Sequence, residues 1–502
     1  MAIGDDSVVA GGGTHTAVPK VPVSEQYPAD AGLVICSLIP YLALTAAVFP
    51  LLHNISRSTG LSMMTLEVTV SVSAAGYTMG TVLAAQLAMH LPRRRLLVVY
   101  ELLLVIASIL AAWAPNGQVF IAGFILQGLA TSLLLIAAVP PLITQWPPAK
   151  MPITAGIMNL CIFGAVAIGP TIGAIQSASG GWRPLFWGVA GVAGVALLLS
   201  LLTFEDEPPV APEAPWDFVA VAMAIIGSAA AFYGAGRLEG THAADLSSIV
   251  PLVCGAALIV ALVVYEYRSG NPLMPVKAAA TTAPVTGIYL ALAASASSFS
   301  IMYLALGSMH VTTSATNTGL LFLPEFAGAI LIAALFGTIF KTRFVPVLAI
   351  CGTLAIIGAA ALLIAVLNGG GAGIAAGTGL LGLGVAATVS PGLFMAGFSL
   401  RSALLQRVFA MIELLRAVTA FLVAPVLVYL ASVLGSTRAG GTRWALWICL
   451  GIAAIGFIGA LALFRAGYRH LQVPNLKRWQ EDGETAWNSP PLLERLRGGE
   501  GV

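Results

Sequence analysis

Long apolar runs alternate with short polar segments from residue 32 to residue 466. Each run holds about 20 consecutive apolar residues, the length that one helical crossing of a bilayer requires. Because lipid offers no hydrogen-bond partners to the backbone, such runs must form helices that satisfy their own backbone groups. The fourteen predicted spans are 32–52, 63–88, 96–114, 118–144, 153–175, 185–204, 216–235, 248–267, 283–306, 318–340, 344–366, 372–397, 405–432 and 443–466. The pattern therefore predicts an all-α, polytopic membrane protein.

Two longer polar segments divide the spans into groups of six, two and six. The first is acidic and Pro-rich, and such a segment acts as a semi-rigid spacer rather than as a fold. The predicted organisation is a disordered tail at 1–30, a six-helix bundle at 31–204, a linker at 205–215, two additional helices at 216–267, a linker at 268–282, a second six-helix bundle at 283–466 and a soluble tail at 467–502.

The distribution of Lys and Arg predicts the orientation, because cytosolic loops are enriched in these residues. With the N-terminus inside, seventeen of the 23 Lys and Arg residues fall on the cytosolic side, five fall outside, and Arg416 lies within a span. We therefore expect a multi-pass protein of the cytoplasmic membrane with both termini in the cytosol.

Composition narrows the function classes. The 502 residues are 58% hydrophobic and 9% charged, whereas soluble domains carry about 25% charged residues. The net charge of +2 gives no nucleic-acid footprint. Five cysteines inside apolar runs show neither metal-ligand spacing nor a disulfide framework. The Gly run at 369–373 lacks the preceding strand and the following Lys of a phosphate loop. We expect no enzyme, no metal, no cofactor and no nucleic-acid partner.

The fifth predicted span contains a stripe of small residues. Ala165, Gly169 and Gly173 recur every four residues, and such a stripe lets two helix backbones approach closely in lipid. Pro170 removes one backbone hydrogen bond within the stripe and predicts a kink. A bent, closely packed helix suits the seam between two bundles that tilt against each other, although an ordinary Gly-rich membrane helix has the same pattern.

Several short patterns occur at fixed places relative to the spans. They are Gly164 followed by Gly169-Pro170-x-x-Gly173, the turn Gly181-Trp182-Arg183, the cluster Arg93-Arg94-Arg95 after the second span, Gln127-Gly128 in the fourth, the run from Gly319 to Pro324, and the run from Arg407 to Arg416. Together with the number of spans, they resemble the major facilitator superfamily, in particular its fourteen-span drug:proton antiporter branch of the multidrug efflux type.

This resemblance implies the major facilitator fold, in which two six-helix lobes flank a central cavity. It also implies a conformational role for the motif residues Gly164, Gly169, Pro170, Gly173, Arg93, Arg94 and Arg95. The partners that it implies are protons and a small hydrophobic or amphipathic substrate. We expect a monomer in the lipid bilayer.

At three positions the chain departs from the pattern of this branch. The acid expected in the first span falls on Tyr41, the acid of the loop after the second span falls near Met89, and the arginine of the fourth span falls on Phe124. Each missing charge is one that the branch uses for proton coupling or for locking one conformation. Any proton coupling must therefore use other groups.

Ionisable residues at membrane depth are costly and are functional candidates by default. The candidates for proton coupling are Glu325, which follows Pro324 and has no partner on its own helix, the pair Glu413 and Arg416, and Glu101. Glu413 and Arg416 are three residues apart and share one helix face, so a static structural pair is the alternative. Arg416 also occupies the late-helix arginine position of the resembling family. Glu67 and Glu101 lie near predicted membrane interfaces, where they can instead be solvated or paired.

Aromatic, thioether and amide side chains within aliphatic spans are candidates for lining a cavity, since loose pockets of this kind suit amphipathic ligands. Each of them can equally be part of ordinary helix packing. They are Tyr41, Tyr77, Gln86, Gln127, Asn159, Met302 and Tyr303.

Three functional hypotheses fit these patterns. The first is a secondary active exporter of hydrophobic or amphipathic compounds that works by alternating access and is driven by proton antiport. The second is an uncoupled facilitator, or an exchanger of another ion, with the same fold. The third is a non-transporting membrane sensor or assembly factor that uses the polar tail from Leu471.

Overall fold

A computed structural model of the chain describes residues 26–203, 209, 211–309, 314–367, 370–467 and 471–492. Within this part, fourteen helices are long and apolar enough to cross a membrane, as the hydrophobic pattern predicts. The helices are α1 (Tyr27–Thr59), α2 (Met63–His90), α3 (Arg93–Trp113), α4 (Gly117–Thr144), α5 (Met151–Asn159), the π-helical turn η2 (Leu160–Gly164), α6 (Ala165–Ala178), α7 (Arg183–Thr203), α8 (Phe218–Thr241), α9 (Leu246–Arg268), α10 (Val276–Ala279), α11 (Thr282–Met309), α12 (Ala315–Ile339), α13 (Val345–Val366), α14 (Gly371–Phe398), the 3₁₀ turn η3 (Ser402–Leu404), α15 (Leu405–Leu434), α16 (Arg438–Gly467) and α17 (Leu476–Glu481).

Short polar residues separate consecutive spans by capping the free backbone N–H groups at helix starts. The side chain of Ser62 accepts a hydrogen bond from the Thr65 amide at 3.1 Å and begins α2. The Asn116 side chain caps α4 through the Val119 amide at 3.0 Å. These caps explain why closely spaced apolar runs form separate helices.

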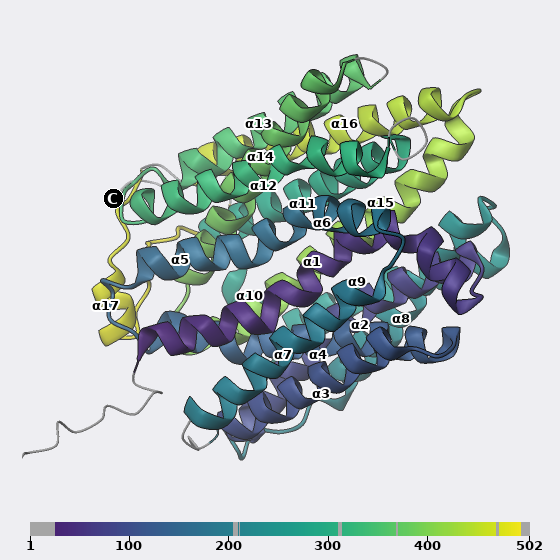
Figure 1. The fold of residues 1–502 in the computed structure, drawn as a ribbon. Coiled ribbons are helices and arrows are strands. Elements are labelled where there is room, and N and C mark those ends of the chain that lie inside the picture. Colours follow the sequence, from purple (N-terminus) through teal and green to yellow (C-terminus); the bar gives the residue numbers. More distant parts are fainter. Residues whose placement is uncertain are drawn as a thin grey trace, which may run out of the picture.

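The helices form two lobes and one added pair. Helices α1–α7 pack into the first lobe, α11–α16 pack into the second, and α8 and α9 pack on each other and, through α8, on α2. The lobes meet along two helix pairs, α5–α6 against α12 and α2 against α15. Figure 1 shows α12–α14 and α16 above α2, α3, α4 and α7, with α5 and α6 between the two groups.

The bundle has two opposite faces, which differ in the chain connections that they carry. The terminal face is the side where α1 begins and α16 ends, at the left of Figure 1. The distal face carries the connections between α1 and α2, between α8 and α9, and between α15 and α16.

The predicted disordered tail at 1–30 overlaps the first helix. Helix α1 already begins at Tyr27, with Pro28 in its first turn, because proline there lacks only an N–H group that a helix start leaves free. Residues 1–25 lie outside the described part, as do residues 204–208 and 210 of the first linker and 493–502 of the tail.

The small-residue stripe of the fifth span packs within the first lobe. A Cβ atom added at Gly169 or Gly173 would collide with the backbone of α1 at Ala43 or Ala47. The stripe therefore holds α6 against α1 within the first lobe, while α6 also packs on α12 of the second lobe. The fifth span thus contributes to the seam between the lobes, but its small residues face the first lobe. The observed departure of this span from α-helical geometry is the π-helical turn η2, while Pro170 lies inside α6.

Other glycines form the seam. A Cβ atom at Gly156 on α5 would lie 2.9 Å from the carbonyl oxygen of Ala333 on α12, and one at Gly337 on α12 would lie 3.0 Å from that of Pro152. Both contacts are tighter than ordinary van der Waals packing. Small residues thus let the lobes touch backbone to backbone near the terminal face, as in other membrane helix pairs.

The polar tail is not a free soluble extension in its described part. Residues 471–492 lie against the terminal face, and the side chains of Trp479 and Trp487 are almost completely buried. The tail deviates from the prediction because two tryptophans remove a large apolar area from water when they pack on the bundle.

Candidate functional site

A large cavity opens at the distal face between the two lobes. Its volume is about 570 Å³, within the range of small-molecule sites. Exposed residues such as His53, His242 and Ser436 line its mouth. Helices α1, α2, α8, α11 and α15 supply its walls. We call it the distal cavity.

Two acids face the distal cavity, Glu67 from α2 and Glu239 from α8. The Tyr303 hydroxyl donates a short hydrogen bond to Glu239 Oε1, and its ring packs 4.1 Å from that of Phe49. None of the described residues that line the cavity is Lys or Arg. The distal cavity therefore combines an aromatic wall with carboxyl groups.

Glu239 was not among the sequence candidates. The hydropathy pattern ends the seventh span at residue 235, because Arg237 and Glu239 resemble the start of a loop. Helix α8 instead continues to Thr241. One sequence signal could have identified Glu239. It lies within two turns of the end of the apolar run, where a helix can still continue.

Smaller cavities continue inward from the distal cavity. An intermediate cavity of about 30 Å³ shares Phe49, Glu239 and Tyr303 with it. A central cavity of about 40 Å³ shares Phe299 and Phe421 with the intermediate one. The three cavities therefore form one line from the distal face to the middle of the bundle, divided by aromatic side chains.

The central cavity brings together Glu325 from α12 and Arg416 from α15. Glu325 is buried, and its Oε2 atom has no hydrogen-bond partner among the described residues. Met302, a predicted cavity residue, lines the same space. Glu325 is thus a buried acid on a membrane-spanning helix, and such residues are costly in lipid and are candidates for a functional role.

Arg416 forms a buried ion pair with Glu413. Its Nη2 and Nε atoms lie 2.6 Å and 2.9 Å from Glu413 Oε2. Nη2 also donates to the Tyr77 hydroxyl on α2 at 3.3 Å, and that hydroxyl donates to Glu413 Oε2 at 3.4 Å. The guanidinium carbon lies 5.9 Å from the ring centre of Phe163 in η2. The pair thus lies where both lobes meet.

Glu101 occupies a different environment. It is buried inside the first lobe, and Ser37 on α1 donates a short hydrogen bond to its Oε1 atom. It does not line the distal, intermediate or central cavity. The motif arginines at the start of the same helix bind other groups, since Arg93 donates to Gln145 Oε1 at 2.7 Å and Arg94 donates to the Leu201 carbonyl at 3.3 Å. Arg95 is exposed.

The predicted cavity residues divide into three groups. Tyr41 and Tyr303 line the cavities, as Met302 does. Gln86 lies at the terminal end of α2, where its Oε1 accepts the Asp217 amide at 3.1 Å. Gln127 donates to Ser108 within the first lobe at 2.9 Å.

Asn159 and Tyr77 instead connect the lobes. Asn159 Nδ2 on α5 donates to the Ala386 carbonyl on α14 at 2.9 Å, and Tyr77 binds the ion pair described above. The sequence suggested that Gln86 and Gln127 line a cavity. In the structure both side chains instead form hydrogen bonds within packed parts of the bundle.

The three departures also have a structural explanation. The Tyr41 hydroxyl lies 2.8 Å from Ser73 Oγ, and Ser73 donates to the Phe124 carbonyl. Phe124 is buried, with its ring 5.7 Å from that of Phe120. At Tyr41 and Phe124, hydroxyl hydrogen bonds and apolar contacts thus replace the charged groups that the family pattern has there. Met89 accepts the Ala211 amide through its carbonyl and so binds the first linker.

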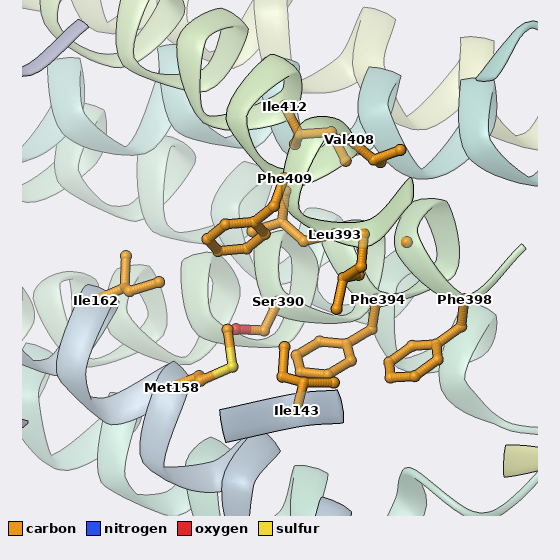
Figure 2. A pocket seen from close by; sticks show the side chains of 12 residues that line it. Ile143, Met158, Ile162, Ser390, Leu393, Phe394, Phe398, Val408, Phe409 and Ile412 are labelled. Carbon is orange, nitrogen blue, oxygen red and sulfur yellow. The ribbon is translucent and has the colours of Figure 1, made fainter. Parts of the chain in front are cut away.

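The bundle is closed toward the terminal face. A narrow terminal pocket of about 20 Å³ remains there, and it shares Ile162 with the central cavity. Figure 2 shows the aromatic rings of Phe394, Phe398 and Phe409 around it, with Met158 of the first lobe on another side. These apolar side chains separate the central cavity from the terminal face.

Two packed helical lobes, a line of cavities open at one face and closed at the other, and buried charged groups where the lobes meet are typical of membrane transport proteins. The family model of the Major Facilitator Superfamily matches residues 33–424. The chain belongs to this superfamily.

The curated relatives match over shorter segments. An uncharacterized MFS-type transporter, YubD of Bacillus subtilis, is 25% identical over 188 residues, which are 37% of each chain. The multidrug resistance protein B homolog of Mycobacterium tuberculosis is 27% identical over 187 residues, or 37% of this chain and 34% of that protein. The chain therefore matches little more than a third of the length of these relatives.

Solved structures confirm the fold. The human organic anion transporter MFSD10 (TETRAN) superimposes with a TM-score of 0.62 and 13% identity, covering 86% of this chain and 99% of that chain. At this identity the likeness concerns the fold alone.

Proposed function

We propose that this protein is a secondary active exporter of hydrophobic or amphipathic compounds, driven by proton antiport across the cytoplasmic membrane. The observation that carries the proposal is the central cavity, where Glu325 lies with Arg416 at the inner end of the cavity line, and where Glu325 Oε2 has no hydrogen-bond partner in the described part of the chain. The printed names of relatives such as the multidrug resistance protein B homolog support export of this substrate class.

The orientation follows from the positive-inside rule. The terminal face carries most of the Lys and Arg residues, so we assign it to the cytosol. In this orientation the distal cavity opens outward, and the structure corresponds to the state that releases substrate and takes up a proton. Protonated Glu325 carries no charge, so the lobes can tilt without moving an unpaired charge through the apolar terminal pocket.

One exchangeable carboxyl group is energetically sufficient. A charge that crosses 100 mV gains about 2.3 kcal/mol, and one pH unit adds about 1.4 kcal/mol. Together these terms support a gradient of roughly five-hundred-fold for a neutral substrate, since a factor of ten corresponds to about 1.4 kcal/mol.

The test uses inverted membrane vesicles and a fluorescent amphiphile found by thermal-shift screening, because ligand binding to the folded state raises its apparent stability. Uptake should increase when a pH gradient is imposed. Glu325→Gln should abolish this increase while it leaves exchange of labelled for unlabelled substrate intact. Glu101→Gln is the matched control, because Glu101 is also a buried carboxyl group but lies away from the cavities.

The alternative, an uncoupled facilitator or an exchanger of another ion, has one supporting observation. Tyr41 replaces the expected acid and binds Ser73, so the first helix offers no carboxyl group to the cavity line. Equal uptake with and without the pH gradient, in the native protein, would favour this alternative and exclude proton antiport.

A further inference from the structure

The described part of the C-terminal tail, residues 471–492, forms a strap across the terminal face. Figure 1 shows its helix α17 at that end of the bundle. Neither the cavity line nor the buried charges explains why this charged segment should be held there.

The strap is anchored on the second lobe. Trp479 is fully buried, its ring centre lies 4.4 Å from that of Phe398 at the end of α14, and its Nε1 atom donates to the Leu400 carbonyl at 2.8 Å. The Ala486 amide donates to the Phe398 carbonyl at 2.8 Å. These contacts fix the strap to the end of α14.

Further along, the strap also binds the start of α11. The Thr282 amide donates to the Pro490 carbonyl at 3.0 Å, and the Ala283 amide donates to Ser489 Oγ at 2.9 Å. The strap therefore moves with the second lobe.

One residue of the strap reaches the first lobe. Gln480 Nε2 donates to the carbonyl oxygens of Thr144 and Trp146, at 2.7 Å and 2.5 Å. Trp146 is itself fixed to the start of α1, since its Nε1 donates to Asp30 Oδ2 at 2.9 Å and its ring packs on Tyr27. Gln480 thus bonds the loop between α4 and α5 to a segment carried by the opposite lobe.

We infer that the strap is a conformational lock that stabilises the state closed at the terminal face and must release at Gln480 before that face opens. The lobes are in contact at the terminal face in this structure, through Gly156 and Gly337. When they separate there, Gln480 cannot keep both carbonyl partners while Trp479 and Ala486 stay on α14. An interaction that exists in only one of two states shifts their ratio by its own free energy.

The lock does not depend on the substrate or on the coupling ion, because every alternating-access cycle must open this face. Loss of the two Gln480 hydrogen bonds should raise the ratio of terminal-open to terminal-closed protein by about five- to 150-fold.

The test is hydrogen–deuterium exchange of the full-length protein in nanodiscs, comparing native protein with Gln480→Ala. Release of the lock should speed exchange in peptides of α5 and of the terminal end of α14, and slow exchange in peptides around the distal cavity. General destabilisation would instead speed exchange at both faces. Lys477→Ala is the control on the same helix, because Lys477 is exposed and, among the residues that the structure describes, pairs with Glu481 on its own helix at 3.8 Å.

A second pair of variants tests the opposite direction. Gln480→Cys combined with Gln145→Cys, in a background without the native cysteines, should be joined by a flexible bis-methanethiosulfonate cross-linker, because the Gln480 side chain itself spans the gap to the loop that holds Gln145. The cross-link should slow exchange at the terminal face, and a reductant should reverse this effect. Unchanged exchange at both faces in Gln480→Ala, or a cross-linked protein that opens its terminal face as readily as the reduced one, would overturn the inference.

Discussion

The hydroxyl of Tyr77 on α2 lies 3.3 Å from Nη2 of Arg416 on α15 and accepts its hydrogen bond. These residues are 339 positions apart in the chain, and they join the two lobes at the buried ion pair. The contact makes the ion pair part of the lobe interface rather than a feature of one helix.

We expect Tyr77 and Arg416 to be energetically coupled. A double-mutant cycle with Tyr77→Phe and Arg416→Lys, followed by equilibrium unfolding in detergent, should give a coupling free energy of about 0.5–1.5 kcal/mol, since residues in one hydrogen-bond network are not additive. Tyr41→Phe serves as the control, because its hydroxyl binds Ser73 within the first lobe. Strict additivity for Tyr77 and Arg416 would contradict the observed bridge.

Replacing one partner of the ion pair should lower the free energy of unfolding more than replacing both partners. Arg416→Gln leaves Glu413 buried without its cation, which is expected to destabilise the protein by about 3–5 kcal/mol. The double variant Glu413→Gln with Arg416→Gln should recover much of this loss. Thermal unfolding of the purified variants measures the difference, and a double variant less stable than either single one would argue against a simple pair.

Alanine substitutions at glycines should distinguish the contact between the lobes from the packing inside the first lobe. Gly156→Ala places a methyl group 2.9 Å from the Ala333 carbonyl oxygen, so it should weaken closure at the terminal face and speed hydrogen exchange there. Gly173→Ala should lower the stability of the first lobe by about 1–3 kcal/mol, the cost of overpacking.

The control for both glycine variants is Gly191→Ala on α7, where no other side chain or backbone atom approaches an added Cβ within 4 Å. This variant should leave exchange at the terminal face unchanged and should not lower stability, because Ala favours a helix more than Gly does. If Gly156→Ala behaves like Gly191→Ala, the glycine contact does not limit closure.

The distal cavity should prefer cations. Glu67 and Glu239 line it, and none of its described lining residues is Lys or Arg. Removing one carboxylate near a bound cation is worth about 1 kcal/mol in a wet cavity, so Glu239→Gln should weaken binding of tetraphenylphosphonium about fivefold when the titration is run at a pH alkaline enough to ionise both carboxyl groups. Binding of triphenylphosphine oxide, a neutral compound of similar shape, should not change. Titrations followed by tryptophan fluorescence give both constants, and equal losses for the two compounds would point to altered packing instead.

The sequence alone determined the membrane architecture. Fourteen apolar runs of sufficient length predict fourteen helices, because spanning depends on a local sum of hydropathy over about 20 residues. It also located the acids and the arginine at membrane depth, since a charge inside an apolar run is visible without knowledge of the fold. Glu325, Glu413 and Arg416 were recognisable on this basis.

Only the tertiary structure decided which residues meet. The partner of the small-residue stripe is α1, the seam uses Gly156 and Gly337, and Glu239 reaches the distal cavity because α8 extends beyond its apolar run. The tail is held by Trp479 and Gln480 on opposite lobes. Hydropathy is a property of neighbours in the chain, whereas these contacts join residues from distant segments, and their geometry depends on how the helices pack.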